Sequence, residues 1–230
     1  MASSSTLYGS GTLEYLLDEL NDFFKDIKTI IFIPYARPGG ISYNDYTKYI
    51  SKPFADIGKT IIGIHEFKNA KNAIEIAEAI YVGGANTFLL VDQLYRENLL
   101  KTLQTAVNSG TPYLGTSAGS NICGLNMKTT NDMPIVYPPS FKTLAFIPFN
   151  INPHYLDPNP ESKHKGETRE TRIKEFHKFN TQPVIGLREG SWLKVQGDQI
   201  TLKGELKARI FEYGKTPYEI ESGSNISKLS

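Results

Sequence analysis

Residues 112–119 read Pro-Tyr-Leu-Gly-Thr-Ser-Ala-Gly, and they predict a strand that turns sharply into a helix. The first four, Pro112 to Gly115, form a short run that suits a buried strand. Gly115, Ser117 and Gly119 then form a G-x-S-x-G pattern, in which small residues allow a tight turn and the serine projects from it. The following helix points its N-terminal N–H groups at the same place. This stretch therefore indicates an α/β fold with a serine presented at the carboxyl edge of a sheet.

The chain before this turn alternates between short apolar strands and helices. Apolar residues recur at helical spacing in the first segment, and β-branched runs of three to five residues follow the pattern of buried parallel strands. This order predicts a three-layer, doubly wound α/β fold with a mainly parallel sheet and helices on both faces. The expected strands are 30–33, 60–64, 80–82 and 112–115, and the expected helices are 13–27, 72–79 and 88–108, the last as one or two segments.

The chain beyond Leu125 is less regular, and residues 126–155 are rich in Pro, Asn and Thr. Short alternating runs near the C-terminus predict antiparallel edge strands. We find no internal repeat or linker, so residues 1–230 are expected to form a single domain, with a flexible polar tail after about residue 217. The expected elements here are strands at 144–147, 183–187, 192–195, 200–202 and 209–213, and a charged helix at 165–179.

Composition narrows the class of protein. The 230 residues are 40% hydrophobic and 21% charged, with a formal net charge of +1. No run of Lys and Arg suggests a nucleic-acid or acidic-membrane partner. No apolar stretch is long enough to cross a bilayer, and the N-terminus lacks the regions of a signal peptide. With one cysteine, Cys123, no internal disulfide is possible, so we expect a cytoplasmic protein.

The glycine-serine turn needs partners before it can act in catalysis. A serine nucleophile usually needs a histidine base. Of the four histidines, His154 is best placed, because it lies in an irregular stretch just after a strand-like run. Without such a partner, the turn also fits a phosphate-binding loop. Gly83-Gly84 opens another helix after a strand, and its N–H groups suit an anion or an oxyanion.

Two carboxylates are candidates for the acid that orients the histidine. Glu189 follows the strand at 183–187 and should emerge at its carboxyl end, where catalytic groups gather in open α/β sheets. Asp132 lies in a polar loop soon after the nucleophile helix. Either could instead cap backbone N–H groups. No cluster of His, Cys and carboxylates has metal-ligand spacing, so neither a metal nor an organic cofactor is expected.

The chain resembles the peptidase E family of α-aspartyl dipeptidases over nearly its whole length, from Ser5 to Trp192, and six sequence blocks within this range occur in the family's order. Each block is moderately specific, and their order is highly specific. The blocks are 82–88 (Val-Gly-Gly-Ala-Asn-Thr-Phe), 115–121 (Gly-Thr-Ser-Ala-Gly-Ser-Asn), 129–136 (Thr-Thr-Asn-Asp-Met-Pro-Ile-Val), 151–154 (Ile-Asn-Pro-His), 164–169 (His-Lys-Gly-Glu-Thr-Arg) and 184–187 (Val-Ile-Gly-Leu).

The resemblance implies a fold similar to class I glutamine amidotransferases, a flavodoxin-like arrangement, with serine in place of their cysteine. It further implies that Ser117 is the nucleophile and His154 the base. The acid maps to Glu189 or Asp132, and its strand-end position favours Glu189. Two further roles follow: the oxyanion donors are the N–H groups of Gly84 and Ala118, and Arg169 matches the arginine that binds the substrate's aspartyl side chain.

The expected activity is hydrolysis of dipeptides with an N-terminal aspartate through an acyl-enzyme, with a small peptide as partner and a monomeric or homodimeric protein. A second interpretation is a cyanophycinase-type hydrolase of another aspartyl amide, and a third is a non-catalytic flavodoxin-like binder of small molecules. One departure from the family is visible. Relatives begin with an apolar strand before the Ser-Ser-Thr-Leu segment, whereas here only Met1-Ala2 precedes it, so that strand is expected to be short or missing.

Overall fold

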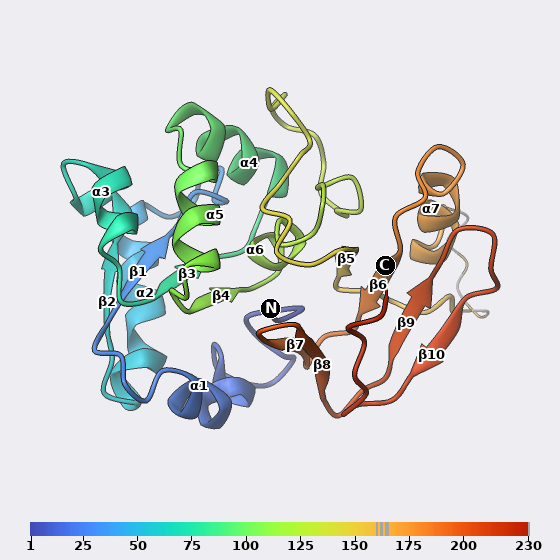
Figure 1. Ribbon diagram of the computed structural model, residues 1–230, viewed down its shortest axis with the longest axis horizontal. Coiled ribbons are helices and arrows are strands. Elements are labelled where there is room, and N and C mark those ends of the chain that lie inside the picture. Colours follow the sequence, from blue (N-terminus) through green and yellow to red (C-terminus); the bar gives the residue numbers. More distant parts are fainter. Residues whose placement is uncertain (160, 162, 164–165, 230) are drawn as a thin grey trace.

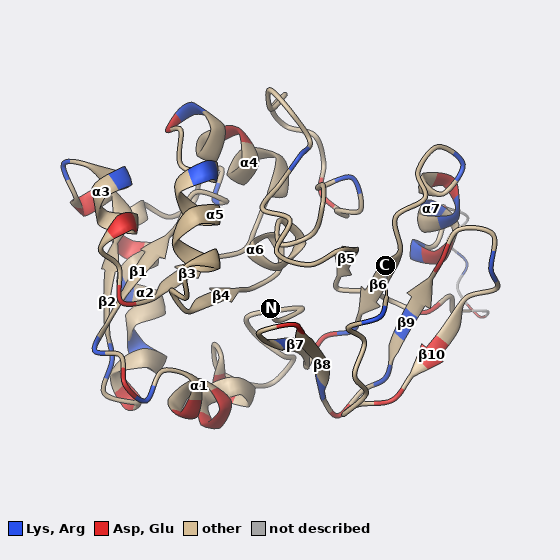
Figure 2. Ribbon diagram, viewed as in Figure 1, with Lys and Arg blue, Asp and Glu red and all other residues tan. Residues whose placement is uncertain are grey.

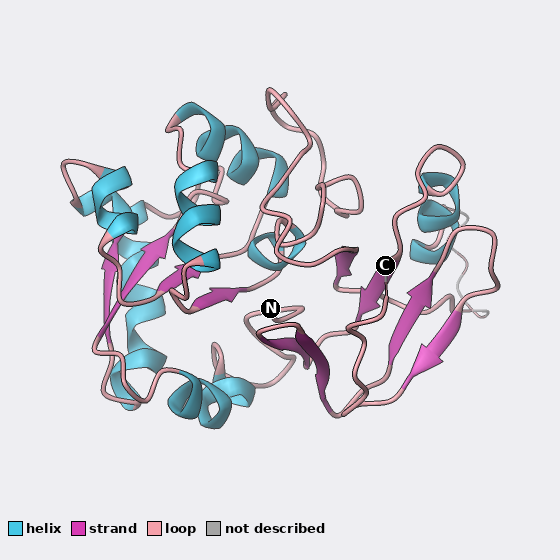
Figure 3. Ribbon diagram, viewed as in Figure 1, coloured by secondary structure: helices cyan, strands magenta, loops and turns pink. Residues whose placement is uncertain are grey.

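The first half of the chain builds a parallel sheet. The structure is a computed structural model that describes residues 1–159, 161, 163 and 166–229 (Figures 1 and 3). The sheet has the order β2-β1-β3-β4, and every neighbouring pair is parallel. This confirms the predicted α/β class. The strands are β1 (Thr29–Ile33), β2 (Thr60–Gly63), β3 (Ile80–Val82) and β4 (Tyr113–Gly115).

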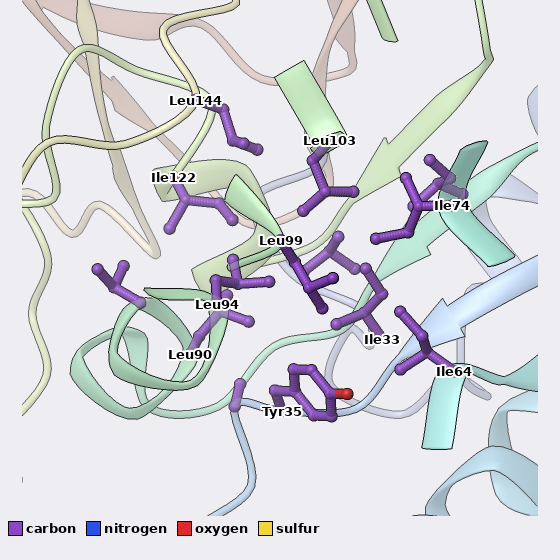
Figure 4. Close-up of a cluster of buried hydrophobic side chains, with 14 of the residues drawn as sticks. Ile33, Tyr35, Ile64, Ile74, Leu90, Leu94, Leu99, Leu103, Ile122 and Leu144 are labelled. Atoms are coloured by element: carbon purple, nitrogen blue, oxygen red, sulfur yellow. The ribbon is translucent and has the colours of Figure 1, made fainter. Parts of the chain in front are cut away.

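Helices cover both faces of this sheet because alternate strand residues point to opposite sides. In β1, Ile31 and Ile33 belong to a buried cluster shared with α3, α4 and α5, whereas Ile30 and Phe32 belong to another shared with α1 and α2. Figure 4 shows the first cluster, with Leu90, Leu94, Leu99 and Leu103 directed toward Ile33 and its neighbours. Each such fully buried side chain contributes roughly 1.5–3 kcal/mol of transfer free energy. The two clusters fix the three layers.

The helices mostly fall where the sequence predicts them, with one addition. The predicted helix 13–27 is shorter, and 88–108 is two helices. The helix α2 was not predicted, because polar residues and Pro53 obscure its pattern, although Tyr46, Ile50 and Phe54 lie on one buried face and Ser42 caps it by accepting the Asp45 N–H. The helical elements are η1 (Glu14–Leu16), α1 (Leu17–Phe23), α2 (Tyr43–Asp56), η2 (Ile64–Glu66), α3 (Ala70–Glu75), α4 (Thr87–Arg96), α5 (Leu100–Asn108) and α6 (Ala118–Asn121).

The second half of the chain forms another four-stranded sheet, which is mixed, and a hairpin. The sheet has the order β10-β9-β6-β5, in which β5 and β6 are parallel and the other pairs antiparallel. β7 and β8 form a separate antiparallel hairpin beside it (Figure 1). The elements are β5 (Asn150–Pro153), α7 (Arg169–Phe176), β6 (Val184–Leu187), β7 (Ser191–Gln196), β8 (Gln199–Gly204), β9 (Ala208–Phe211) and β10 (Tyr218–Ile220).

Three expectations for this half differ from the structure. Residues 144–147 form no strand; Leu144 and Ile147 are buried from an irregular segment, and the strand comes later, as β5. The tail expected to be flexible after about residue 217 instead forms β10 against β9, and Ile226 and Leu229 are buried beyond it. Helix α7 is shorter than the predicted 165–179. The start of that prediction, with His164 and Lys165 of the family block, lies outside the described residues.

The segment Met1–Ser3 joins the two halves. Ala2 bridges Thr116 in parallel and Trp192 in antiparallel fashion, so it lies between β4 and β7. Its N–H donates to Gly115 O at 2.8 Å, and its carbonyl accepts the Ser117 N–H at 3.1 Å. The expected short first strand is therefore a two-sided bridge beside the turn that carries Ser117. Among the described residues, no helix has the length and apolar character that crossing a membrane requires.

Candidate active site

Ser117 stands at the sharp turn between β4 and α6, with φ 53° and ψ −112°. A positive φ is unfavourable for a residue with a Cβ, so close packing must hold it there. The flanking glycines allow that packing. A Cβ on Gly119 would lie 2.2 Å from Val82 O, and one on Gly115 would lie 2.4 Å from Gly119 O. Both glycines are therefore needed for the strand and helix to approach closely enough to form the turn.

His154 directly follows β5 and lies across from the serine. Its Nε2 is 2.8 Å from Ser117 Oγ, within hydrogen-bond distance. Its backbone also has a positive φ, 53°. The His154 N–H donates to Ser3 Oγ at 2.8 Å, and that hydroxyl donates to Leu187 O at 2.7 Å. Ser3, which the sequence did not suggest, thus fixes the backbone that presents the imidazole.

Glu189 supplies the carboxylate that contacts the histidine. Its Oε1 is 2.6 Å from His154 Nδ1. The register of the parallel strands explains the meeting, since Pro153 pairs with Leu187 and the two side chains emerge just beyond that pair. A carboxylate on Nδ1–H leaves Nε2 free to accept the Ser117 hydroxyl proton. Ser117, His154 and Glu189 thus form a continuous hydrogen-bonded series, the geometry of a Ser-His-acid triad.

Asp132, the alternative acid, makes different contacts. Its Oδ2 accepts the Thr87 N–H at 2.7 Å, the Thr87 hydroxyl at 2.6 Å and the Thr130 hydroxyl at 2.9 Å. No hydrogen bond joins it to His154 in the described part of the chain. Asp132 therefore caps the first turn of α4 while lying near the serine. Thr87 and Thr130 were not predicted as site residues; the position of Thr87 directly after the Gly83-Gly84-Ala85-Asn86 turn was the available signal.

Two backbone N–H groups lie beside Ser117 without an acceptor. Ala118 begins the four-residue helix α6, and Gly84 approaches so closely that a Cβ on it would lie 2.7 Å from the Ser117 Cβ. Within the residues that the structure describes, neither N–H has a protein hydrogen-bond acceptor. Unpaired donors beside a nucleophile suit an oxyanion, which is the role the sequence predicted for both.

A cavity of about 210 Å³ opens beside these groups and contains opposite charges. Arg169, the first residue of α7, lines one side of it and Asp132 another. Burial lowers the pKa of Arg169, and Arg172 adds to this, whereas Asp132 opposes it. The cavity is lined by Thr87, Ser117, Thr130, Asn131, Asp132, Pro153, His154 and Arg169. Four of the five side chains predicted to have catalytic or binding roles therefore line this cavity, and the fifth, Glu189, contacts one of them, His154.

The predicted lack of a metal ligand set stays a prediction. The described residues contain no group of three or more His, Cys, Asp or Glu side chains placed to hold a metal ion. Cys123, two residues beyond the end of α6, is buried, and this burial raises its pKa to about 12. A thiol so far from ionisation is a poor nucleophile. Cys123 therefore acts as a core residue rather than as part of the site.

Comparison with known proteins agrees with this geometry. The sequence model of Peptidase family S51 matches residues 1–203. A protein named peptidase E from Streptomyces coelicolor is 47% identical over 229 residues, covering 100% of this chain and 93% of the relative. A probable alpha-aspartyl dipeptidase from Drosophila melanogaster is 44% identical over 215 residues, covering 92% and 88%.

Solved structures support the same fold. The crystal structure of a peptidase from an acI-B1 Actinobacterium superposes with a TM-score of 0.70 at 20% identity, covering 95% of this chain and 93% of that one. A putative peptidase E from Listeria monocytogenes gives a TM-score of 0.58 at 19% identity, covering 96% of each chain. At such identities these two structures are evidence for the fold alone, and the sequence relatives are the evidence for the family. The chain belongs to peptidase family S51 and is a serine peptidase.

Proposed function

We propose that the protein is a serine-type dipeptidase that hydrolyses Asp-Xaa dipeptides through an acyl-enzyme. The observation that carries this proposal is the series Ser117–His154–Glu189 at the edge of a cavity that also holds Arg169. The names of the relatives, peptidase E and probable alpha-aspartyl dipeptidase, support the same substrate class. They favour it over a cyanophycinase-type amidase or a non-catalytic flavodoxin-like binder.

In this mechanism Ser117 Oγ attacks the peptide carbonyl while His154 Nε2 accepts its proton. Glu189 holds the imidazole in the required tautomer and stabilises the imidazolium. The negative charge that develops on the carbonyl oxygen is bound by the N–H groups of Gly84 and Ala118. His154 then donates its proton to the departing amine. Water, activated by the same histidine, attacks the ester carbonyl and releases aspartate, restoring the Ser117 hydroxyl.

Arg169 is proposed to bind the β-carboxylate of the substrate's aspartyl residue. Burial of that carboxylate in a small cavity is unfavourable unless it is paired. A guanidinium can compensate with two parallel hydrogen bonds, which a lysine cannot reproduce. Arg169 has no ion-pair partner in the described part of the chain, so its charge is available to a ligand.

A release assay on matched dipeptides tests the proposal. Asp-Leu should be cleaved with the highest kcat/KM, and Glu-Leu, Asn-Leu and Ala-Leu should be cleaved much more slowly. The Ser117→Ala variant is the control for contaminating peptidases. Equal turnover of all four dipeptides, or no turnover of Asp-Leu, would overturn the proposed substrate.

A cytoplasmic location is also proposed, since the single cysteine needs no oxidising compartment, and cell fractionation tests it.

A further inference from the structure

Asp132 has one carboxylate oxygen in use and one free. The three hydrogen bonds from Thr87 and Thr130 all end on Oδ2. Oδ1 accepts none in the described part of the chain, and it is not among the buried polar atoms that lack a partner. Asp132 also lines the cavity, so Oδ1 is the carboxylate oxygen that remains available to a ligand there. Capping α4 therefore accounts for Oδ2 and leaves Oδ1 without an assigned role.

The cavity is lined by two opposite charges that attract each other without forming an ion pair in the described residues. Arg169 and Asp132 both line it, yet no ion pair joins them in the described residues. Asp132 is also the sole described carboxylate in the lining, since Glu189 contacts His154 from outside. A ligand with one negative and one positive group separated by a short carbon chain would match both. An N-terminal aspartyl residue has these groups, a β-carboxylate and an α-ammonium.

We propose that Asp132 Oδ1 binds the free α-ammonium of the substrate, so that the cavity accepts an aspartyl residue only at the N-terminus of a peptide. This inference rests on the proposed function. It names the side chain that limits the enzyme to cleaving after the N-terminal residue of a peptide. The α-ammonium is attached to the carbon next to the carbonyl that Ser117 attacks. It must therefore lie close to Ser117, and the cavity places Asp132 there.

The bonds to Thr87 and Thr130 suit this role. An ammonium that leaves water needs a fixed anion, because a mobile carboxylate would lose side-chain entropy on pairing. Three donors on Oδ2 hold the Asp132 carboxylate in one orientation before substrate arrives. An N-acetylated or internal aspartyl residue has a neutral amide in place of the ammonium. Its single N–H carries no charge and is a weaker partner for Oδ1, so the site should bind such a substrate less tightly.

The decisive experiment compares two substrates that differ only in the amine. Aspartic acid α-p-nitroanilide carries both charged groups, and succinic acid mono-p-nitroanilide lacks only the α-ammonium. Wild-type enzyme should prefer the first. Asp132→Asn should lower kcat/KM for the aspartyl substrate about 10- to 100-fold, as loss of a charge-assisted hydrogen bond does. It should change the rate on the succinyl substrate about twofold or less. Arg169→Ala is the matched control, because both substrates keep the β-carboxylate and both should slow.

An equal loss on both substrates in Asp132→Asn would overturn the proposal, since it would mean that the residue only holds α4 and the loop in place. No loss on either would overturn it as well. A binding measurement keeps the test decisive if turnover collapses. In the inactive Ser117→Ala background, calorimetry should show Asp-Leu binding more tightly than succinyl-Leu, and adding Asp132→Asn should remove the difference. If wild type cleaves no aspartyl substrate, the proposed function fails, and this binding comparison still decides the role of Asp132.

Discussion

The first region of the molecule, residues 1–125, and the second, residues 126–229, are held together differently. The first has two large apolar clusters on the faces of a parallel sheet. The second has a smaller apolar core and a network of ion pairs across α7, β9 and β10, where acidic and basic residues lie together in Figure 2. The rigid first region supplies the serine and backbone donors, and the charged second region supplies the histidine, both carboxylates and the arginine.

This division separates two tasks of the site. The groups from the first region act through backbone shape, since Gly84, Ala118 and the turn at Ser117 depend on close packing. The groups from the second region act through charge, and they reach the serine from strand ends and a helix start. A change to Ser117 should therefore remove the reaction itself, whereas changes to the two carboxylates and the arginine should separate orientation from substrate recognition.

The largest effect should come from the first region. Ser117→Ala should leave the fold intact, because the lost hydroxyl is small and alanine fits the turn as well as serine. Activity should fall by several orders of magnitude, about 10⁶ in kcat as in a related triad. The measurement is steady-state cleavage of Asp-Leu, with circular dichroism as the control for folding. Near-normal turnover in purified Ser117→Ala would exclude the serine mechanism.

The next effect distinguishes the two carboxylates of the second region. Glu189→Gln should lower kcat roughly 10⁴-fold, because an amide on His154 Nδ1 no longer fixes the tautomer. Asp132→Asn is the matched control and should cost much less, since Asp132 bonds Thr87 and Thr130 instead. Both variants keep side-chain size. If Asp132→Asn proved the more damaging in kcat on all substrates, the orienting role would belong to Asp132.

A smaller effect should appear at Arg169. Arg169→Ala should lower kcat/KM for Asp-Leu about ten- to a hundredfold, because a charge-assisted hydrogen bond to the β-carboxylate is lost. The ratio of kcat/KM for Asp-Leu over Asn-Leu should fall with it, and Arg169→Lys should recover only part. An unchanged ratio would mean that another group recognises the aspartyl side chain.

The smallest effect should be on stability, through Arg188. Its guanidinium contacts Asp157 at 2.7 Å and Glu219 at 2.8 Å and holds the pKa of both carboxyls below their usual values. Folding therefore gains stability above the unfolded pKa values, about 3.9 and 4.3, and loses it as pH falls through the folded ones. Arg188→Met should lower Tm by about 2–4 °C at pH 7, the shift for roughly 1 kcal/mol in a chain of this size.

The difference in Tm between wild type and Arg188→Met should disappear as pH falls from 5 to 3, because wild type loses the same ion pairs in that range. The matched control is Lys207→Met, which removes a single pair with Glu221 between two exposed side chains. Its Tm should change little at either pH. A pH-independent deficit in Arg188→Met would mean that Arg188 stabilises through its packing on Tyr155 rather than through charge.

The two regions also differ in how far the sequence predicts them. Strands 30–33, 80–82 and 112–115 were found because buried parallel strands are continuous apolar runs. In the second region Leu144 and Ile147 are apolar and buried without being a strand, since burial alone does not determine backbone pairing. The predicted flexible tail differs from the structure for a related reason: β10 is mostly polar and is fixed by hydrogen bonds to β9, which local sequence does not reveal.

Prediction of the site residues from sequence has the same limit, because local sequence does not reveal contacts between distant segments. The G-x-S-x-G turn is a local pattern, so Ser117 could be found from sequence. The choice between Glu189 and Asp132 depends on the register of β5 with β6, which brings Pro153 beside Leu187, and spacing along the chain does not contain that information. Ser3 was missed for the same reason, because its contacts with His154 and Leu187 join residues far apart in the chain.

The positive φ angles of Ser117 and His154 imply a trade-off between activity and stability. Each such backbone conformation costs of the order of 1–3 kcal/mol in a residue with a side chain, and glycine adopts it freely. Ser117→Gly should therefore unfold at a higher temperature than Ser117→Ala, despite the greater freedom of glycine in the unfolded chain. Both variants lack the serine hydroxyl, so the comparison isolates the backbone strain. Under the proposed mechanism, selection for thermal stability alone would replace this serine, and the need for a nucleophile would retain it.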